Sequence, residues 1–157
     1  MKIKLIVVGK TKSKFLVDGE KIYSKRLKHY CKFTEFIIPD VKNSGKLSTL
    51  ELKKKEGESI LSAINNSAEV VLLDENGSSF SSVEFSNFIN KKMLSSNKEL
   101  VFVVGGAFGF SDQVYKRSNS KLSLSKMTFS HQMIRLFFKE QLYRSHTILK
   151  NEKYHHQ

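Results

Sequence analysis

The segment 100–104 (LVFVV), followed at once by three glycines within five residues, restricts the possible folds of this chain more than any other feature. A short run of β-branched and aromatic residues without polar alternation is typical of a strand buried on both faces, as in a parallel sheet. The glycines of segment 105–109 (GGAFG) have no Cβ atoms that would keep a ligand away from the backbone. Open α/β sheets bind ligands beyond the carboxyl ends of their strands, so the pattern predicts a small-molecule pocket here. The pattern alone is equally compatible with plain loop punctuation.

The rest of the chain alternates strand and helix patterns, which predicts one α/β domain over residues 1–157 with a mostly parallel sheet flanked by helices. Ser48 with Glu51, and Ser81 with Glu84, have the S-x-x-E spacing that begins a helix. The sequence 74–77 (DENG) predicts a turn. The expected strands cover residues 1–8, 34–38, 69–73, 100–104 and 120–124, and the expected helices cover 17–30, 48–65, a segment starting at 81, 111–117 and 130–147.

The charge balance predicts a polyanionic partner. Lys and Arg number 27 against 15 Asp and Glu, a net charge of +12, which favours phosphate contacts and salt-dependent binding to nucleic acid. An anionic membrane surface is the minor alternative, because no basic amphipathic anchor helix stands out. The sequence has no apolar run of the ~20 residues that span a bilayer and no signal-peptide pattern, so we expect a cytoplasmic protein. The single cysteine, Cys31, agrees with a reducing compartment.

Several other chemistries lack their motifs. The dinucleotide fingerprint G-x-G-x-x-G is missing, and segment 9–12 (GKTK) is not a phosphate-binding loop. No G-x-S-x-G elbow of a triad hydrolase is present. The five histidines do not have the spacing of a zinc site, so we expect no metal.

Four stretches carry a family resemblance: 103–109 (VVGGAFG), 122–132 (LSLSKMTFSHQ), 140–144 (EQLYR) and the pair Tyr154-His155. Together they resemble the signature series of the RlmH family, SPOUT-class methyltransferases of the bacterial large ribosomal subunit. The resemblance runs the length of the chain and departs at Ser130, where the family usually has a proline before the histidine. It implies a SPOUT fold with a C-terminal trefoil knot, S-adenosyl-L-methionine (SAM) as cofactor, and a homodimer in which the partner subunit completes the site.

The activity implied by this resemblance is methylation of N3 of a pseudouridine in the helix 69 region of 23S rRNA, on the assembled ribosome. A non-enzymatic rRNA-binding or ribosome assembly factor on the same scaffold is the alternative. A SPOUT enzyme acting on tRNA is disfavoured, because the chain has no added RNA-binding domain.

Site residues follow from the motif match. The N3 imide must lose its proton, which a nearby cation or base makes easier, and the methyl donor must lie in line with it. We expect Arg144 and His155 near the base and Tyr154 to position it, with the tail ordered over the cofactor pocket. His131 and Arg135 are the other catalytic candidates, and the general base is not identified. The positions matched to cofactor binding are Leu73, Gly105, Leu124, Ser125, Lys126, Met127, Thr128 and Phe129.

Overall fold

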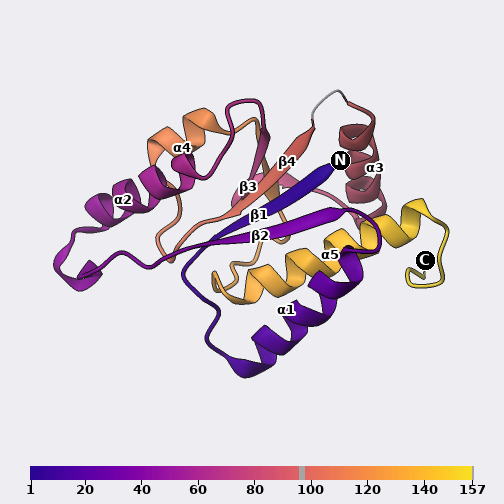
Figure 1. Cartoon of the computed structure of the whole chain (residues 1–157), viewed down its shortest axis with the longest axis horizontal. Coiled ribbons are helices and arrows are strands. Elements are labelled where there is room, and N and C mark those ends of the chain that lie inside the picture. The colour runs from indigo at the N-terminus through magenta and orange to yellow at the C-terminus, as the bar shows by residue number, and fades with distance from the viewer. Residues whose placement is uncertain (96–97, 157) are drawn as a thin grey trace.

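A five-stranded sheet forms the middle layer of the structure, a computed structural model that describes residues 1–95 and 98–156 (Figure 1). The strand order is β2-β1-β4-β3-β5, and every neighbouring pair is parallel. The apolar run lies at the centre as β4, and all six of its residues are buried. The predicted α/β class and parallel sheet are therefore confirmed. The strands are β1 (Lys2–Val8), β2 (Lys32–Ile38), β3 (Glu69–Ser79), β4 (Glu99–Val104) and β5 (Ser120–Ser123).

Helices cover both faces of the sheet (Figure 1). On one face α1 (Lys14–Leu27), α3 (Ser82–Leu94) and α5 (Met133–Leu149) pack against one set of strand side chains. On the other face α2 (Thr49–Ser62) and α4 (Asp112–Arg117) pack against the alternate set. The two apolar clusters follow from the period of two along each strand. A short 3-10 helix, η1 (Ser44–Lys46), precedes α2.

The helix starts agree with the sequence where a capping box is present. Ser48 and Ser81 each accept a hydrogen bond from the backbone of the glutamate three residues on, and each glutamate accepts one in return. Two predicted starts were wrong by three residues: α1 begins at Lys14 instead of 17, and α5 begins at Met133 instead of 130. Neither helix has a side-chain cap at its N-cap residue, so the sequence carried no strong local signal there.

The prediction that a turn ends the third strand at residues 74–77 was wrong. The carboxylate of Asp74 does accept a hydrogen bond from the Asn76 N–H, which is ordinary turn chemistry. However, β3 continues to Ser79 and pairs with β5 a second time after a register shift. A Cβ atom on Gly77 would lie 2.7 Å from the backbone of Leu122, so glycine permits this close approach of the two strands.

Two whole-molecule expectations have different outcomes. Among the described residues, no helix is both long enough and apolar enough to cross a bilayer. The trefoil knot implied by the resemblance stays a prediction.

Candidate active site

A cavity of about 590 Å³ opens at the carboxyl ends of β3, β4 and β5, a volume typical of small-molecule sites. Its walls are the loops that follow these strands, together with the start of α5. The cavity brings together seven of the eight positions matched to cofactor binding: Leu73, Gly105, Leu124, Ser125, Met127, Thr128 and Phe129. Lys126 is exposed and is not among the described lining residues.

Glycine is required in the loop after β4 for packing reasons. A Cβ atom on Gly105 would lie 3.1 Å from the ring of Phe110 and 3.3 Å from the carbonyl oxygen of Gly109. Gly109 has a φ of +82°, a conformation that favours glycine, and its N–H donates to the carbonyl of Gly106 at 3.2 Å. The loop therefore turns tightly and presents backbone to the cavity.

The opposite wall is held by short local hydrogen bonds. Ser123 Oγ donates to the carbonyl of Ser125 at 2.8 Å, and Ser125 Oγ accepts from the Met127 N–H at 3.0 Å. Sequence reasoning missed two other lining residues, Asp74 and Tyr115, whose side chains are joined by a hydrogen bond of 2.5 Å. Burial, followed by this bond, raises the pKa of Tyr115 to about 12, so the phenol stays protonated. The turn sequence after β3 was the available signal for Asp74.

His131 lies at the rim of the cavity, at the entry to α5. Burial, with the positive charges of Arg135 and Lys12, lowers its pKa, and Asp40 opposes the shift. The imidazole is therefore neutral at physiological pH and offers both a donor and an acceptor nitrogen.

Arg135 does not reach the cavity. Its side chain is buried and donates to the carbonyl oxygens of Val8 at 2.5 Å, Gly9 at 2.8 Å and His131 at 2.9 Å. A fourth bond goes to Thr11 Oγ1 at 3.1 Å. The structure thus places this catalytic candidate as a brace between the end of β1 and the start of α5.

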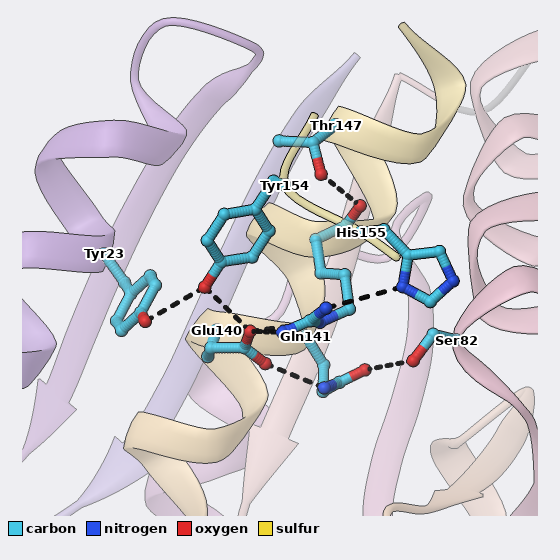
Figure 2. Close-up of polar contacts among 8 residues, drawn as sticks. Tyr23, Ser82, Glu140, Gln141, Thr147, Tyr154 and His155 are labelled. Atoms are coloured by element: carbon cyan, nitrogen blue, oxygen red, sulfur yellow. Dashed lines mark hydrogen bonds and ion pairs between the residues drawn. The ribbon is translucent and has the colours of Figure 1, made fainter. Parts of the chain in front are cut away.

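The other polar candidates gather around Glu140 on α5 (Figure 2). Glu140 Oε1 accepts from Arg144 Nη2 at 2.6 Å and from the Tyr154 hydroxyl at 2.9 Å. The guanidinium lies 4.8 Å from the centre of the Tyr154 ring and 3.4 Å from His155 Nδ1. Tyr154 also meets the hydroxyl of Tyr23 on α1 at 3.1 Å. We call Glu140, Arg144, Tyr154 and His155 the tail cluster.

Charges in the tail cluster are well defined. Burial works against the charge of Arg144, but hydrogen bonds and attraction from Glu140 outweigh it and raise the arginine pKa. Burial and the hydrogen bonds to Tyr23 and Glu140 also raise the pKa of Tyr154. The cluster therefore presents a permanent cation beside a protonated phenol. Sequence reasoning missed Glu140, although its i,i+4 spacing from Arg144 was a usable signal.

The tail cluster and the cavity are separate within one chain. None of its members is among the described lining residues. Ten residues of α5 separate Ile134, which lines the cavity, from Arg144, which corresponds to about 15 Å along the helix axis. The tail folds back against α1 and α5, as the hydrogen bond from Tyr30 to Glu152 at 2.5 Å also shows. In a single chain, the expected order of the tail over the cofactor pocket is therefore not seen.

With this geometry described, similarity to known proteins becomes informative. A family described as predicted SPOUT methyltransferase matches residues 1–155. A protein named ribosomal RNA large subunit methyltransferase H from Christiangramia forsetii is 61% identical over 99% of each chain. Proteins of the same name from Flavobacterium psychrophilum and Parabacteroides distasonis are 59% and 55% identical over the full length of both chains.

The chain belongs to the RlmH family of SPOUT methyltransferases. RlmH-like motifs thus account for both groups of residues, the cavity wall and the tail cluster. In the parts of the chain that the structure describes, no three His, Cys, Asp or Glu side chains are grouped as metal ligands would be.

Proposed function

We propose that this RlmH-family protein uses SAM to methylate N3 of a pseudouridine in the helix 69 region of 23S rRNA on the assembled ribosome, in the cytoplasm. The observation that carries the proposal is the gathering of Leu73, Gly105 and five residues of the 124–129 segment around one cavity of about 590 Å³. Relatives with more than half of their residues identical are named ribosomal RNA large subunit methyltransferases, which supports rRNA as the substrate. The net charge of +12 suits this polyanionic partner.

A homodimer is part of the proposal. The tail cluster lies about 15 Å along α5 from the cavity of its own chain, so a second copy has to supply it to complete the site. Exposed apolar side chains near the cavity support such an interface: Met127 is 77% exposed, Phe129 42% and Phe137 41%. Phe129 and Phe137 already contact each other, with ring centres 4.9 Å apart.

The tail cluster would act on the acceptor base. SAM supplies a methyl group that its sulfonium already activates. Arg144, kept cationic by Glu140, stabilises the N3 anion of the base and so lowers the pKa of the imide. Tyr154 stacks on the base, as aromatic side chains do with unpaired RNA bases, and His155 hydrogen-bonds to its edge.

Residues at the start of α5 would serve the cofactor side. Neutral His131 lies at the cavity rim and is suited to accept or donate one hydrogen bond there. Arg135 holds the carbonyl of His131 and thereby positions the loop.

Two measurements test the proposal. Calorimetric titration should show that the protein binds SAM. Transfer of labelled methyl groups should then be efficient on assembled ribosomes and poor on naked rRNA, with a reverse-transcription stop at the modified base. A protein that binds ribosomes but neither binds SAM nor transfers methyl groups would be a non-enzymatic assembly factor instead.

A further inference from the structure

A buried carboxyl group lies directly behind the glycine loop of the cavity. Glu56 on α2 is 8% exposed. A Cβ atom on Gly106 would lie 2.5 Å from its Oε2 and 2.8 Å from its Oε1, and Gly106 lines the cavity. The φ of Gly106 is outside the left-handed region, so the backbone does not require glycine there. Instead, glycine leaves room for the carboxyl group at the cavity wall.

Glu56 has no partner among the described residues. No hydrogen bond or ion pair from these residues engages its carboxyl group, although it is among the most buried acidic groups of the chain. Burial and the nearby charge of Asp40 raise its pKa. Burying a carboxylate without a partner is costly, and a cation placed against it removes most of that cost.

Asp40 supplies a second carboxylate at the same edge of the sheet. A Cβ atom on Gly9 would lie 2.4 Å from Asp40 Oδ1, so this side chain lies against the end of β1. Strands β2, β1 and β4 are neighbours, and the chain leaves β1 toward α1 on one face and β4 toward α4 on the other. Such a switch point opens a crevice in α/β sheets. His131, at the cavity rim, is close enough to Asp40 for the carboxylate to affect its pKa.

A second polar atom in this region also lacks a partner. The hydroxyl oxygen of Ser111 is fully buried, and none of the described residues bonds to it. A Cβ atom on Gly57, the residue after Glu56, would lie 2.3 Å from that oxygen. The layer between α2 and the loop after β4 therefore holds two polar groups that the protein leaves unsatisfied.

We propose that Glu56, together with Asp40, forms the subsite for the α-ammonium group of the amino-acid part of SAM. The inference rests on the proposed function, in which the adenosine part fills the cavity. The amino-acid part carries a primary ammonium group, which donates charge-assisted hydrogen bonds to carboxylates. RNA is excluded as the ligand of this subsite, because its phosphates would be repelled by two acidic groups.

The test compares three ligands by calorimetry on the full chain: S-adenosylhomocysteine, the analogue that lacks only its amine, and methylthioadenosine, which lacks the whole amino-acid part. We expect Glu56→Gln to weaken S-adenosylhomocysteine by about ten- to hundred-fold, the range for a hydrogen bond to a charged group. Binding of the two ligands without the amine should stay within about two-fold of wild type. Glu58→Gln, an exposed glutamate of the same helix, is the matched control and should change none of the three.

Other outcomes overturn the inference. Equal weakening of all three ligands would make Glu56 a brace for the glycine loop, and unchanged binding of S-adenosylhomocysteine would remove its role. If Glu56→Gln does not fold, Asp40→Asn, on an exposed residue, decides by the same criteria. Wild-type protein that binds none of the three ligands would overturn the proposed function as well, so the two failures are distinguishable.

Discussion

The hydroxyl groups of Tyr23 on α1 and Tyr154 in the C-terminal tail lie 3.1 Å apart, although 131 positions separate them in the sequence. Because Tyr154 donates its single hydroxyl proton to Glu140, Tyr23 is the donor in this pair. Glu140 also holds Arg144. The position of the tail is therefore set jointly by α1 and α5.

Tyr23→Phe should lower the rate of methyl transfer without changing cofactor affinity. The change removes one hydrogen bond to Tyr154, worth about 1 kcal/mol, which corresponds to roughly a five-fold lower kcat. Single-turnover methylation of ribosomes at saturating SAM is the measurement. Tyr115→Phe removes the equivalent atom beside the cavity and should instead weaken SAM binding. A Tyr23→Phe variant with weaker SAM binding and normal kcat would contradict the role of the tail cluster.

Deletion of residues 152–157 should reduce methyl transfer by at least ~100-fold, the scale expected for misplaced catalytic groups. SAM affinity should stay within about two-fold, because no described tail residue lines the cavity. The melting temperature should fall by a few degrees, since Tyr154 packs on Tyr143 with ring centres 4.8 Å apart. Turnover at the wild-type rate by the truncated protein would show that the tail is dispensable.

Gly105→Val should abolish SAM binding. The added side chain would collide with Phe110 and the backbone of Gly109, so the loop would have to move away from the cavity. Such overpacking costs about 1–3 kcal/mol, and thermal unfolding should show a matching loss of stability. Gly45→Ala is the control, because a Cβ atom there meets nothing within 4 Å. SAM binding by Gly105→Val at the wild-type affinity would mean that the cofactor binds elsewhere.

Stability should fall in mild acid because of His146. Burial, with the charge of Lys150, lowers its pKa from 6.5 to about 4, and its Nε2 is buried without a partner among the described residues. Above pH 6.5 the ring is neutral in both states, and its contribution is fully present. Between pH 6.5 and about 4 the unfolded chain binds a proton that the native state excludes, so roughly 3 kcal/mol is lost.

Denaturant titrations over this pH range are the measurement for His146. In His146→Phe the free energy of unfolding should depend less on pH, whereas a change at exposed His29 to Gln should leave the dependence intact. An unaltered pH profile in His146→Phe would assign the acid sensitivity to another group.

Lys139→Met should destabilise the protein by about 3–5 kcal/mol, the usual cost of removing one partner from a buried ion pair. Lys139 is 1% exposed and contacts Glu20 at 2.6 Å and Glu35 at 2.9 Å. Lys14→Met breaks an exposed pair with Asp18 and should change stability by less than about 1 kcal/mol. Equal effects of the two substitutions on chemical denaturation would refute a structural role for the buried network.

Local sequence determined the elements and the position of the pocket. The uninterrupted apolar run at 100–104 could only be a strand covered on both faces, which requires a parallel sheet with helices on each side. The S-x-x-E pairs at Ser48 and Ser81 located two helix starts, because a capping box satisfies backbone groups within four residues. Glycines after a buried strand likewise marked where backbone could approach a ligand.

Only the tertiary structure decided how these elements are combined. Nothing near residue 74 reveals that β3 resumes pairing with β5 beyond it, because the partner strand lies more than forty residues away. Arg135 and Arg144 lie on the same helix, yet one braces the end of β1 and the other belongs to the tail cluster. The carboxyl groups of Glu56 and Asp40 meet at the cavity edge only because β2, β1 and β4 are neighbours in the sheet. Contacts of this kind depend on which apolar faces are buried together, and that is a property of the whole chain rather than of any segment.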